Sequence, residues 1–370
     1  MSKTDWFKFA ALPALPPGSA ADTPLRPFLW RLMRGEDLSA AEAADFLRAL
    51  LNRERSSVEQ IAAAMVALAA KGETSEELAG MATVMRERAA PFETRKQKFI
   101  DVSGTGSSRA KTFNVSTAVA FVVAGAGLSV AKQVNRRVSS GTGSAEVLEA
   151  LGVRLHFSKD QGGEARSREN AYAAFNGAGI GFLPAQAFHQ QMNLIATVKR
   201  KLGLRTTFNL LGALVNPARP PFQIVGVWHP SLLTPVAEAL AALGARRAWV
   251  VHGSDGLDEL TIEGETHIVE AVEGKINRFT VTPEDFGLRR GKTEDLRATT
   301  PEASAQIIRE ILNGKRRDEA RNLVVLNAAA ALLVGGAAKS EMQAARLAEQ
   351  SLDSDSARIK LERAVMTTNK

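Results

Sequence analysis

The residues best suited to chemistry in this 370-residue sequence lie where apolar runs end. The run Phe99–Val102 is followed by the glycine-rich turn Gly104-Thr105-Gly106, and the run Leu128–Val134 delivers a polar cluster of Lys132, Asn135 and Arg136. A helical pattern follows each run, so free backbone N–H groups gather at helix starts and can bind anions, while Lys132 and Arg136 add full charges. The carboxyl ends of parallel strands meet at one edge of a sheet. The segment therefore predicts a phosphate or pyrophosphate site, although one such turn alone is weak support.

A second candidate group is the acidic pair Asp258-Glu259. The pair follows the apolar run Arg247–His252 within the segment V-H-G-S-D-G-L-D-E-L. Adjacent carboxylates past a strand end can help to hold Mg²⁺, which prefers carboxylates and substrate phosphate oxygens to an all-protein cage. An isolated Asp-Glu pair is more often a solvated turn, so these residues alone leave both interpretations open. The histidines show no spacing typical of metal ligands to one another, as judged for His156, His229 and His267.

Helical patterns come before these strands and then alternate with them. Residues 26 to 92 are predicted to be helical, with capping boxes at Ser39-x-x-Glu42, Ser56-x-x-Glu59 and Thr74-x-x-Glu77. Beyond them we expect strands at Phe99–Val102, Leu128–Val134, Gln223–Trp228 and Arg247–His252. Helices are expected between them, including residues 116–126, His189–Leu202 and Ser231–Leu243. This alternation predicts an α/β domain with a mostly parallel central sheet.

The pattern changes after the acidic pair. Three short strands are expected to form an antiparallel excursion, at Thr261–Ile262, Thr266–Val272 and Asn277–Val281. Thr300 is predicted to cap a helix that has Pro301 in its first turn. Leu323–Val334 is apolar all round, which predicts a buried helix.

Composition limits the class of protein. The chain is long enough for two domains, and its 45% apolar and 24% charged residues are ordinary globular values. It contains no cysteine, which excludes disulfides, thiolate metal sites and cysteine nucleophiles. No apolar run reaches the length of a membrane span, and the first 20 residues lack the pattern of a signal peptide. The net charge of +7 suits an enzyme for polyanionic substrates and also a nucleic-acid binder.

These motifs, taken together, resemble the anthranilate phosphoribosyltransferase family, which is glycosyltransferase family 3 and has a fold like that of the class II nucleoside phosphorylases. Its usual G-T-G-G-D-x-x-x-T-F-N is matched by G-T-G-S-S-R-A-K-T-F-N from Gly104 to Asn114, and its K-H-G-N-R by K-Q-V-N-R from Lys132 to Arg136. The segments RTTFNLLGALVNPA, VVHGSDGLDEL and VVLNAAAALLVGG resemble later motifs, and two N-terminal segments resemble the family's first helices. The likeness covers nearly the whole chain and keeps the family's order.

The resemblance implies an α/β protein with a small all-helical domain and a larger domain with a mostly parallel central sheet. The implied division is an N-terminal tail at 1–25, a helical domain at 26–95 that also receives part of 185–205, and a phosphoribosyl-pyrophosphate-binding domain at 96–370. The implied reaction moves phosphoribose from phosphoribosyl pyrophosphate to anthranilate in tryptophan biosynthesis and depends on Mg²⁺. A cytoplasmic homodimer without a membrane partner is also implied.

The resemblance also implies roles for single residues. The phosphoribosyl pyrophosphate would contact Gly104, Thr105, Gly106, Thr112, Asn114, Ser116, Thr117, Lys132 and Ser140. Magnesium would be held by Ser116, Asp258 and Glu259. The acceptor would contact Gln133, Asn135, His189 and Lys199.

The acceptor side departs from the family pattern. Gln133 and Val134 replace His-Gly, Gln186 replaces a proline, and Ala213 replaces the proline of L-G-P-L. Lys199 stands where the family has an arginine that recognises the anthranilate carboxylate, and lysine lacks the planar fork that grips a carboxylate through two bonds. Ser107-Ser108 replaces Gly-Asp in the first loop.

Three functions stay open on these grounds. The first is the family's own reaction, and the second is transfer to another aromatic or heterocyclic amine. The third is a non-catalytic nucleic-acid-binding relative, whose binding would weaken steeply with salt. The retained donor motifs argue against the third, because DNA binding needs none of them.

Two of the acceptor residues also have a structural interpretation. His189 could be a packed histidine, and Lys199 could be part of a solvated basic face.

Overall fold

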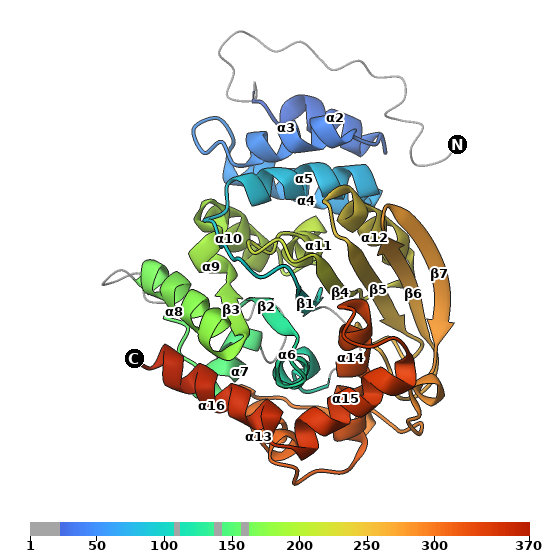
Figure 1. Cartoon of the computed structure of the whole chain (residues 1–370). Coiled ribbons are helices and arrows are strands. Elements are labelled where there is room, and N and C mark those ends of the chain that lie inside the picture. Colours follow the sequence, from blue (N-terminus) through green and yellow to red (C-terminus); the bar gives the residue numbers. More distant parts are fainter. Residues whose placement is uncertain (1–22, 107–111, 137–142, 157–162) are drawn as a thin grey trace.

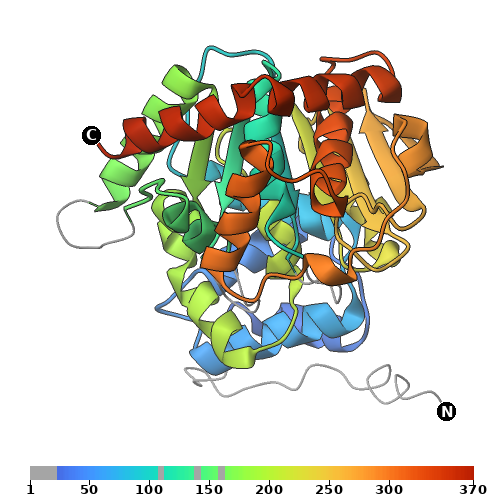
Figure 2. The same ribbon diagram turned by 90° about the horizontal axis from the view of Figure 1, so that it is seen from below.

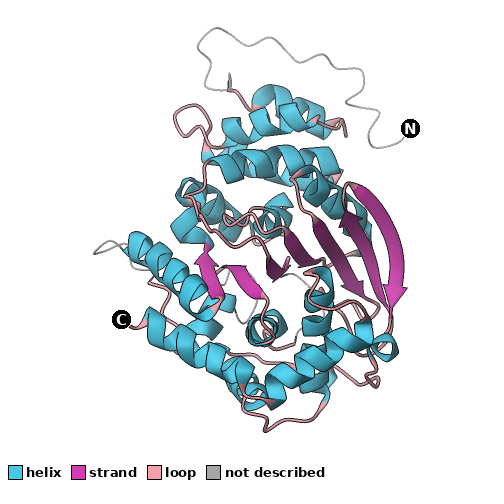
Figure 3. Cartoon of the chain, viewed as in Figure 1, coloured by secondary structure: helices cyan, strands magenta, loops and turns pink. Residues whose placement is uncertain are grey.

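A seven-stranded sheet organises the chain, for which the computed structural model describes residues 23–106, 112–136, 143–156 and 163–370. The strand order is β3-β2-β1-β4-β5-β6-β7 (Figures 1 and 3). The first five strands are parallel: β1 (Phe99–Gly104), β2 (Ser129–Val134), β3 (Ile180–Pro184), β4 (Phe222–Gly226) and β5 (Arg247–Gly253). The last two, β6 (Thr266–Val272) and β7 (Lys275–Val281), are antiparallel. The predicted fold class is confirmed.

The central strands are apolar because helices cover both of their faces. One face packs on α6 (Val115–Gly125) and α14 (Glu319–Val334), and nearly every residue of both helices is buried. The remaining helices on this side are α7 (Ser144–Ala150), α13 (Pro301–Leu312), α15 (Glu341–Asp353) and α16 (Ser356–Thr368). Helix α8 (Gly163–Ala178) packs on β3 and contributes Ala171 and Phe175 to a separate cluster with Phe99 and Ala131. The C-terminal helix α16, red in Figure 2, lies across α6 and α8.

The helical domain lies beyond the other face of the sheet (Figure 1). It contains α2 (Arg26–Met33), α3 (Ala40–Leu50), α4 (Val58–Lys71) and α5 (Ser75–Glu87). Between it and the sheet are α9 (Ala185–Phe188), α10 (Asn193–Leu202), α11 (Thr207–Leu214) and α12 (Leu233–Ala242). Because α10 and α11 pack on α4 while one apolar cluster joins α5, α11, α12 and β5, the two domains share a core.

Several expected boundaries differ from the structure. The second capping box is wrong by one residue: Ser57 caps α4 with Gln60, whereas the Ser56 hydroxyl donates to the Ala49 carbonyl. Thr261–Ile262 is not a strand, because the Thr261 hydroxyl bonds Asp255 at 2.7 Å and its N–H bonds Thr266 within the turn. The helices expected from His189 and Ser231 begin at Asn193 and Leu233, after short 3₁₀ turns.

Strand β3 has no counterpart among the expected strands. It reads Ile-Gly-Phe-Leu-Pro, and glycine and proline are depleted in strands. Gly181 is needed there because a Cβ would lie 2.9 Å from the Ala171 carbonyl oxygen of α8. None of the helices in the described part of the chain is long and apolar enough to span a membrane.

Candidate active site

A cavity of about 1300 Å³ opens at the carboxyl edge of the parallel strands. Its floor is formed by the ends of β1 and β2 and by the loop after β5, and its far wall by α10 and α11. Pockets for one small molecule are typically about 300–1,000 Å³, so this cavity has room for two substrates. The sequence-predicted residues that line it are Gly104, Thr105, Gly106, Thr112, Asn114, Ser116, Lys132, Gln133, Asn135, His189, Lys199, Asp258 and Glu259.

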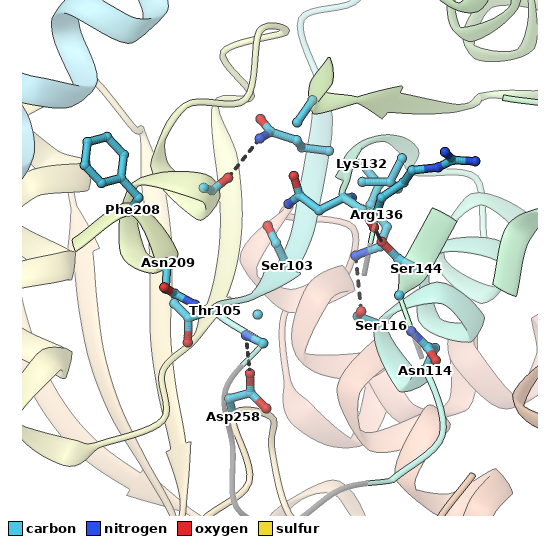
Figure 4. A pocket seen from close by; sticks show the side chains of 18 of the residues that line it. Ser103, Thr105, Asn114, Ser116, Lys132, Arg136, Ser144, Phe208, Asn209 and Asp258 are labelled. Carbon is cyan, nitrogen blue, oxygen red and sulfur yellow. Dashed lines mark hydrogen bonds between the residues drawn. The ribbon is translucent and has the colours of Figure 1, made fainter. Parts of the chain in front are cut away.

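The glycine turn after β1 lies directly against Asp258 of the acidic pair (Figure 4). The Gly106 N–H donates to Asp258 Oδ2 at 2.9 Å, and the Thr105 N–H donates to the Gly226 carbonyl at 2.9 Å. A Cβ on Gly104 would lie 2.8 Å from Asp258 Oδ2, and Gly106 has a φ of +65°. Glycine is therefore required at both positions, at one for close approach and at the other for its left-handed backbone.

Lys132 crosses from β2 to the start of α6. Its side chain is only 3% exposed, and its Nζ donates to the Val102 carbonyl and to Ser116 Oγ, the latter at 3.1 Å (Figure 4). Burial lowers the pKa of Lys132, and the carboxylates of Asp101 and Glu259 oppose that shift. The ammonium is thus placed under the glycine turn, with its charge balanced by two acids.

The acidic pair after β5 is buried, and its two carboxyl groups have raised pKa values. Burial raises the pKa of Asp258, and it raises the pKa of Glu259 well above its usual value, with the neighbouring Asp258 adding to the shift. Glu259 Oε2 is shielded from solvent and has no hydrogen-bond partner among the described residues. Two clustered carboxylates disfavour each other's ionisation until a cation joins them.

The protein offers few metal ligands besides this pair. The described residues contain no group of three histidine, aspartate or glutamate side chains able to hold an ion. The possible metal ligands at the site are hard oxygen atoms, namely those of the two carboxylates and of the Ser116 hydroxyl. They fit Mg²⁺ if substrate oxygens and water complete the shell.

Asn114, which was predicted to contact the phosphoribosyl pyrophosphate, is bonded to Ser304. Its N–H donates to Ser304 Oγ at 2.9 Å, and its Oδ1 accepts from Ser304 Oγ at 3.0 Å.

One predicted donor residue among the described residues, Thr117, does not line the cavity. Thr117 is fully buried on the core side of α6. Because successive residues of a helix point about 100° apart, Ser116 faces the cavity and Thr117 faces the core. Ser140 lies outside the described residues.

Side chains of α10 and α11 form the end of the cavity where the sequence predicts the acceptor. Lys199 on α10 lines the cavity, and burial lowers its pKa to about 8. No ion pair joins it to a carboxylate of the described residues. An isolated, half-buried ammonium at this end of the cavity is suited to an anionic group on a ligand.

Gln133 and His189 also border this end, but one side-chain nitrogen of each bonds the main chain. Gln133 Nε2 donates to the Gly212 carbonyl at 3.0 Å, and His189 Nε2 donates to the Val215 carbonyl at 2.9 Å. Burial lowers the pKa of His189 to about 4, so the ring is neutral at pH 7 and carries one N–H. Asn135 donates its backbone N–H to Ser144 Oγ at 3.3 Å.

The structure adds cavity residues to which no role was assigned from the sequence. They include Arg205, Phe208, Asn209 and Gly212, all from the segment R-T-T-F-N-L-L-G that was recognised as a motif. The charge of Arg205 lowers the pKa of Asp258, in opposition to burial, and its guanidinium lies 5.7 Å from the Trp228 ring centre. The R-T-T-F-N motif was the signal that could have identified them.

Comparison with known proteins gives one consistent family. The glycosyl transferase family, a/b domain, matches residues 96–358, and the glycosyl transferase family, helical bundle domain, matches residues 26–89. The chain is 47% identical over 332 residues to the anthranilate phosphoribosyltransferase of Moorella thermoacetica, covering 90% of this chain and 95% of that protein.

Solved structures agree. A crystal structure of anthranilate phosphoribosyltransferase from Thermus thermophilus superposes with a TM-score of 0.81 at 39% identity, covering 92% of this chain and 99% of that one. The enzyme from Saccharomyces cerevisiae in complex with PRPP and Mg shares the fold, with a TM-score of 0.83 at 23% identity over 95% and 99% of the two chains.

Proposed function

This chain belongs to the glycosyl transferase family that joins a helical bundle domain to an a/b domain, and we propose that it is a Mg²⁺-dependent anthranilate phosphoribosyltransferase. The observation that carries the proposal is the meeting of three sets of groups in one cavity. The glycine turn, the buried Lys132 and the acidic pair Asp258-Glu259 form a polyanion and metal site at one end, and Lys199 forms an anion site at the other. Its reaction would serve tryptophan biosynthesis.

The donor end would bind phosphoribosyl pyrophosphate. Lys132 would supply the full positive charge for the phosphate oxygens, because the Thr105 and Gly106 N–H groups already bond the Gly226 carbonyl and Asp258. Asn114 and Thr112 lie at the start of α6, where they can orient the same groups.

Asp258, Glu259 and the Ser116 hydroxyl would hold Mg²⁺. The fit rests on the unpartnered Glu259 Oε2 and on the raised pKa values of both carboxyls, because a cation placed between them restores their ionised form. Bound there, the ion would neutralise charge that develops on the departing pyrophosphate.

The transfer forms a bond between the acceptor nitrogen and C1 of the ribose and breaks the bond from C1 to the pyrophosphate oxygen. The amine loses one proton, and pyrophosphate leaves with the bonding electron pair. No side chain of the protein needs to bond covalently to either substrate. The chain contributes positioning and electrostatic stabilisation, with Lys132 at the leaving group and Lys199 at the carboxylate of the acceptor.

A second candidate is transfer to a different aromatic or heterocyclic amine. It is favoured by the acceptor end of the cavity, where Gln133, Gln186 and Lys199 depart from the family pattern, while the turn Gly104–Gly106, Lys132 and the acidic pair are retained. The family's reaction ranks first because 47% identity extends over nearly the whole chain.

We also propose that two copies associate through the helical domain. Val58 and Val66, 43% and 39% exposed, lie two turns apart on α4, and Met33 at the end of α2 is 46% exposed. Sedimentation should give twice the chain mass of 39.6 kDa, and a monomer at micromolar concentration would refute the association.

Donor binding is the experiment that tests the function most simply. Calorimetry with phosphoribosyl pyrophosphate should show heat in the presence of Mg²⁺ and weak or no binding with a chelator. Absence of binding at millimolar donor with Mg²⁺ would refute the proposal for either acceptor.

A further inference from the structure

The C-terminal end of α11 is held by side chains from three distant elements. A helix leaves its last carbonyls without partners inside the helix. At α11 the Gly212 carbonyl accepts from Gln133 on β2, the Leu214 carbonyl accepts from Arg86 Nε on α5 at 2.8 Å, and the Val215 carbonyl accepts from His189. We call Arg86, Gln133 and His189, together with these carbonyls, the α11 joint.

The joint is buried throughout. Arg86, Gln133 and His189 are 8%, 5% and 4% exposed. The next residue after the joint, Asn216, is also fixed, because its Nδ2 donates to Asp101 Oδ2 at 2.7 Å and to the Ala131 carbonyl at 2.8 Å. Water cannot readily replace such bonds, so each one lost leaves a desolvated carbonyl unpaired.

The orientation of the Gln133 amide follows from its partner. The Gly212 carbonyl can only accept a hydrogen bond, so the amide nitrogen must face it and the oxygen must point away. That oxygen is shielded from solvent and has no partner among the described residues. Neither polar atom of Gln133 is therefore presented to a ligand in the cavity.

Gln133 is adjacent in sequence to Lys132, and successive residues of a strand face opposite sides of the sheet. Lys132 reaches α6 and the donor end, whereas Gln133 reaches α11. The inner surface of α11, with Phe208, Asn209 and Gly212, forms the wall of the cavity's acceptor end. One strand thus links the donor site to the acceptor wall.

We propose that Gln133 is a positioning residue that fixes α11 against β2 and so sets the distance between the acceptor and the donor carbon; this rests on the proposed function. Arg86 and His189 complete the same joint from the helical domain and from the segment before α10. Misplacement of a substrate by about 1 Å can reduce a rate by about 100-fold, so the position of this wall matters for catalysis.

Gln133→Met tests the proposal, because methionine has a similar length and no N–H donor. We expect the acceptor KM to rise about tenfold while the dissociation constant of phosphoribosyl pyrophosphate changes by less than about twofold. Amide hydrogen exchange in residues 207–216 should become faster in the ligand-free protein. Gln306→Met, at an exposed glutamine on α13 that does not line the cavity, is the matched control.

Each other outcome overturns the proposal. A raised acceptor KM with unchanged exchange would mean that Gln133 contacts the acceptor itself, and an equal loss of donor affinity would mean that it acts through Lys132. If neither the acceptor KM nor the exchange rate changes, Gln133 does not position α11. If Gln133→Met does not fold, His189→Leu removes the neighbouring bond and should give the same pattern.

The exchange measurement needs no turnover, and donor binding needs no acceptor. A wild-type protein that binds the donor but does not use anthranilate would refute the assigned acceptor. Faster exchange near α11 in Gln133→Met would still support the joint in that case, and unchanged exchange would refute it.

Discussion

The two ends of the cavity are built in different ways. At the donor end the functional groups contact one another: Gly106 bonds Asp258, and Lys132 bonds Ser116. At the acceptor end Gln133 and His189 bond the main chain at the C-terminal end of α11, and Lys199 is a charged residue that lines the cavity. The donor end is a set of mutually balanced charges, whereas the acceptor end is a wall whose position decides what fits.

This contrast indicates which parts of the site tolerate change. The charged donor groups depend on each other, since removal of one leaves the others buried and uncompensated. The acceptor wall can accept a substitution in one support while other supports keep the helix in place. The departures from the family pattern at Gln133, Gln186 and Lys199 line this end of the cavity, and Ala213 is buried in α11.

The largest expected effect is at the donor end. Lys132→Met should weaken donor binding about 100-fold or more, because it removes a buried ammonium and leaves Asp101 and Glu259 without its charge. Calorimetry of donor binding measures the effect, with circular dichroism to verify the fold and the exposed Lys201→Met as control. A dissociation constant for the donor within about threefold of the wild-type value would contradict the view that the donor end depends on its buried charges.

Gly226→Ala should have the next largest effect. A Cβ at this position would lie 1.6 Å from the Asp258 carbonyl oxygen, so the acidic pair must move. We expect the Mg²⁺ concentration for half-maximal activity to rise about 30-fold, because misplaced ligands bind the ion poorly. Gly177→Ala on α8, where a Cβ meets nothing within 4 Å, is the control. Equal magnesium requirements in both variants would show that the pair does not hold the ion.

The pH dependence of acceptor binding should sharpen the contrast. The pKa of Lys199 is lowered to about 8, so its charged fraction falls as pH rises through 8. Since the ammonium is the form that attracts a carboxylate, the acceptor KM should rise about tenfold between pH 7 and pH 9. Lys199→Arg keeps its charge in this range and should remove that rise. A persistent rise in Lys199→Arg would assign the titration to another group.

The donor end could be predicted from the sequence because its groups follow strands directly. The turn after Phe99–Val102 and the pair after Arg247–His252 reach one sheet edge in any parallel arrangement of these strands. The sequence does not show which face of α6 meets the cavity, and Thr117 lies on the buried face. Strand β3 was missed because its glycine serves close packing on α8 rather than strand propensity.

The acceptor wall could not be predicted in the same way. Arg86, Gln133 and His189 lie far apart in the sequence and meet only at the end of α11. Arginine, glutamine and histidine can each bind a ligand or support the main chain. Their burial and their hydrogen bonds to main-chain carbonyls show which of these applies here. The position of Ser57 rather than Ser56 as the helix cap is a similar case, because both serines have an acid or amide three residues later.

The central claim is that this cavity transfers phosphoribose to anthranilate at a metal site formed by the acidic pair. It is tested by following anthranilate fluorescence while purified protein, Mg²⁺ and phosphoribosyl pyrophosphate are mixed. We predict a donor-dependent loss of signal that Asp258→Asn reduces at least about 100-fold. No loss of signal from the wild-type protein, with donor binding intact, would contradict the claim and point to another acceptor.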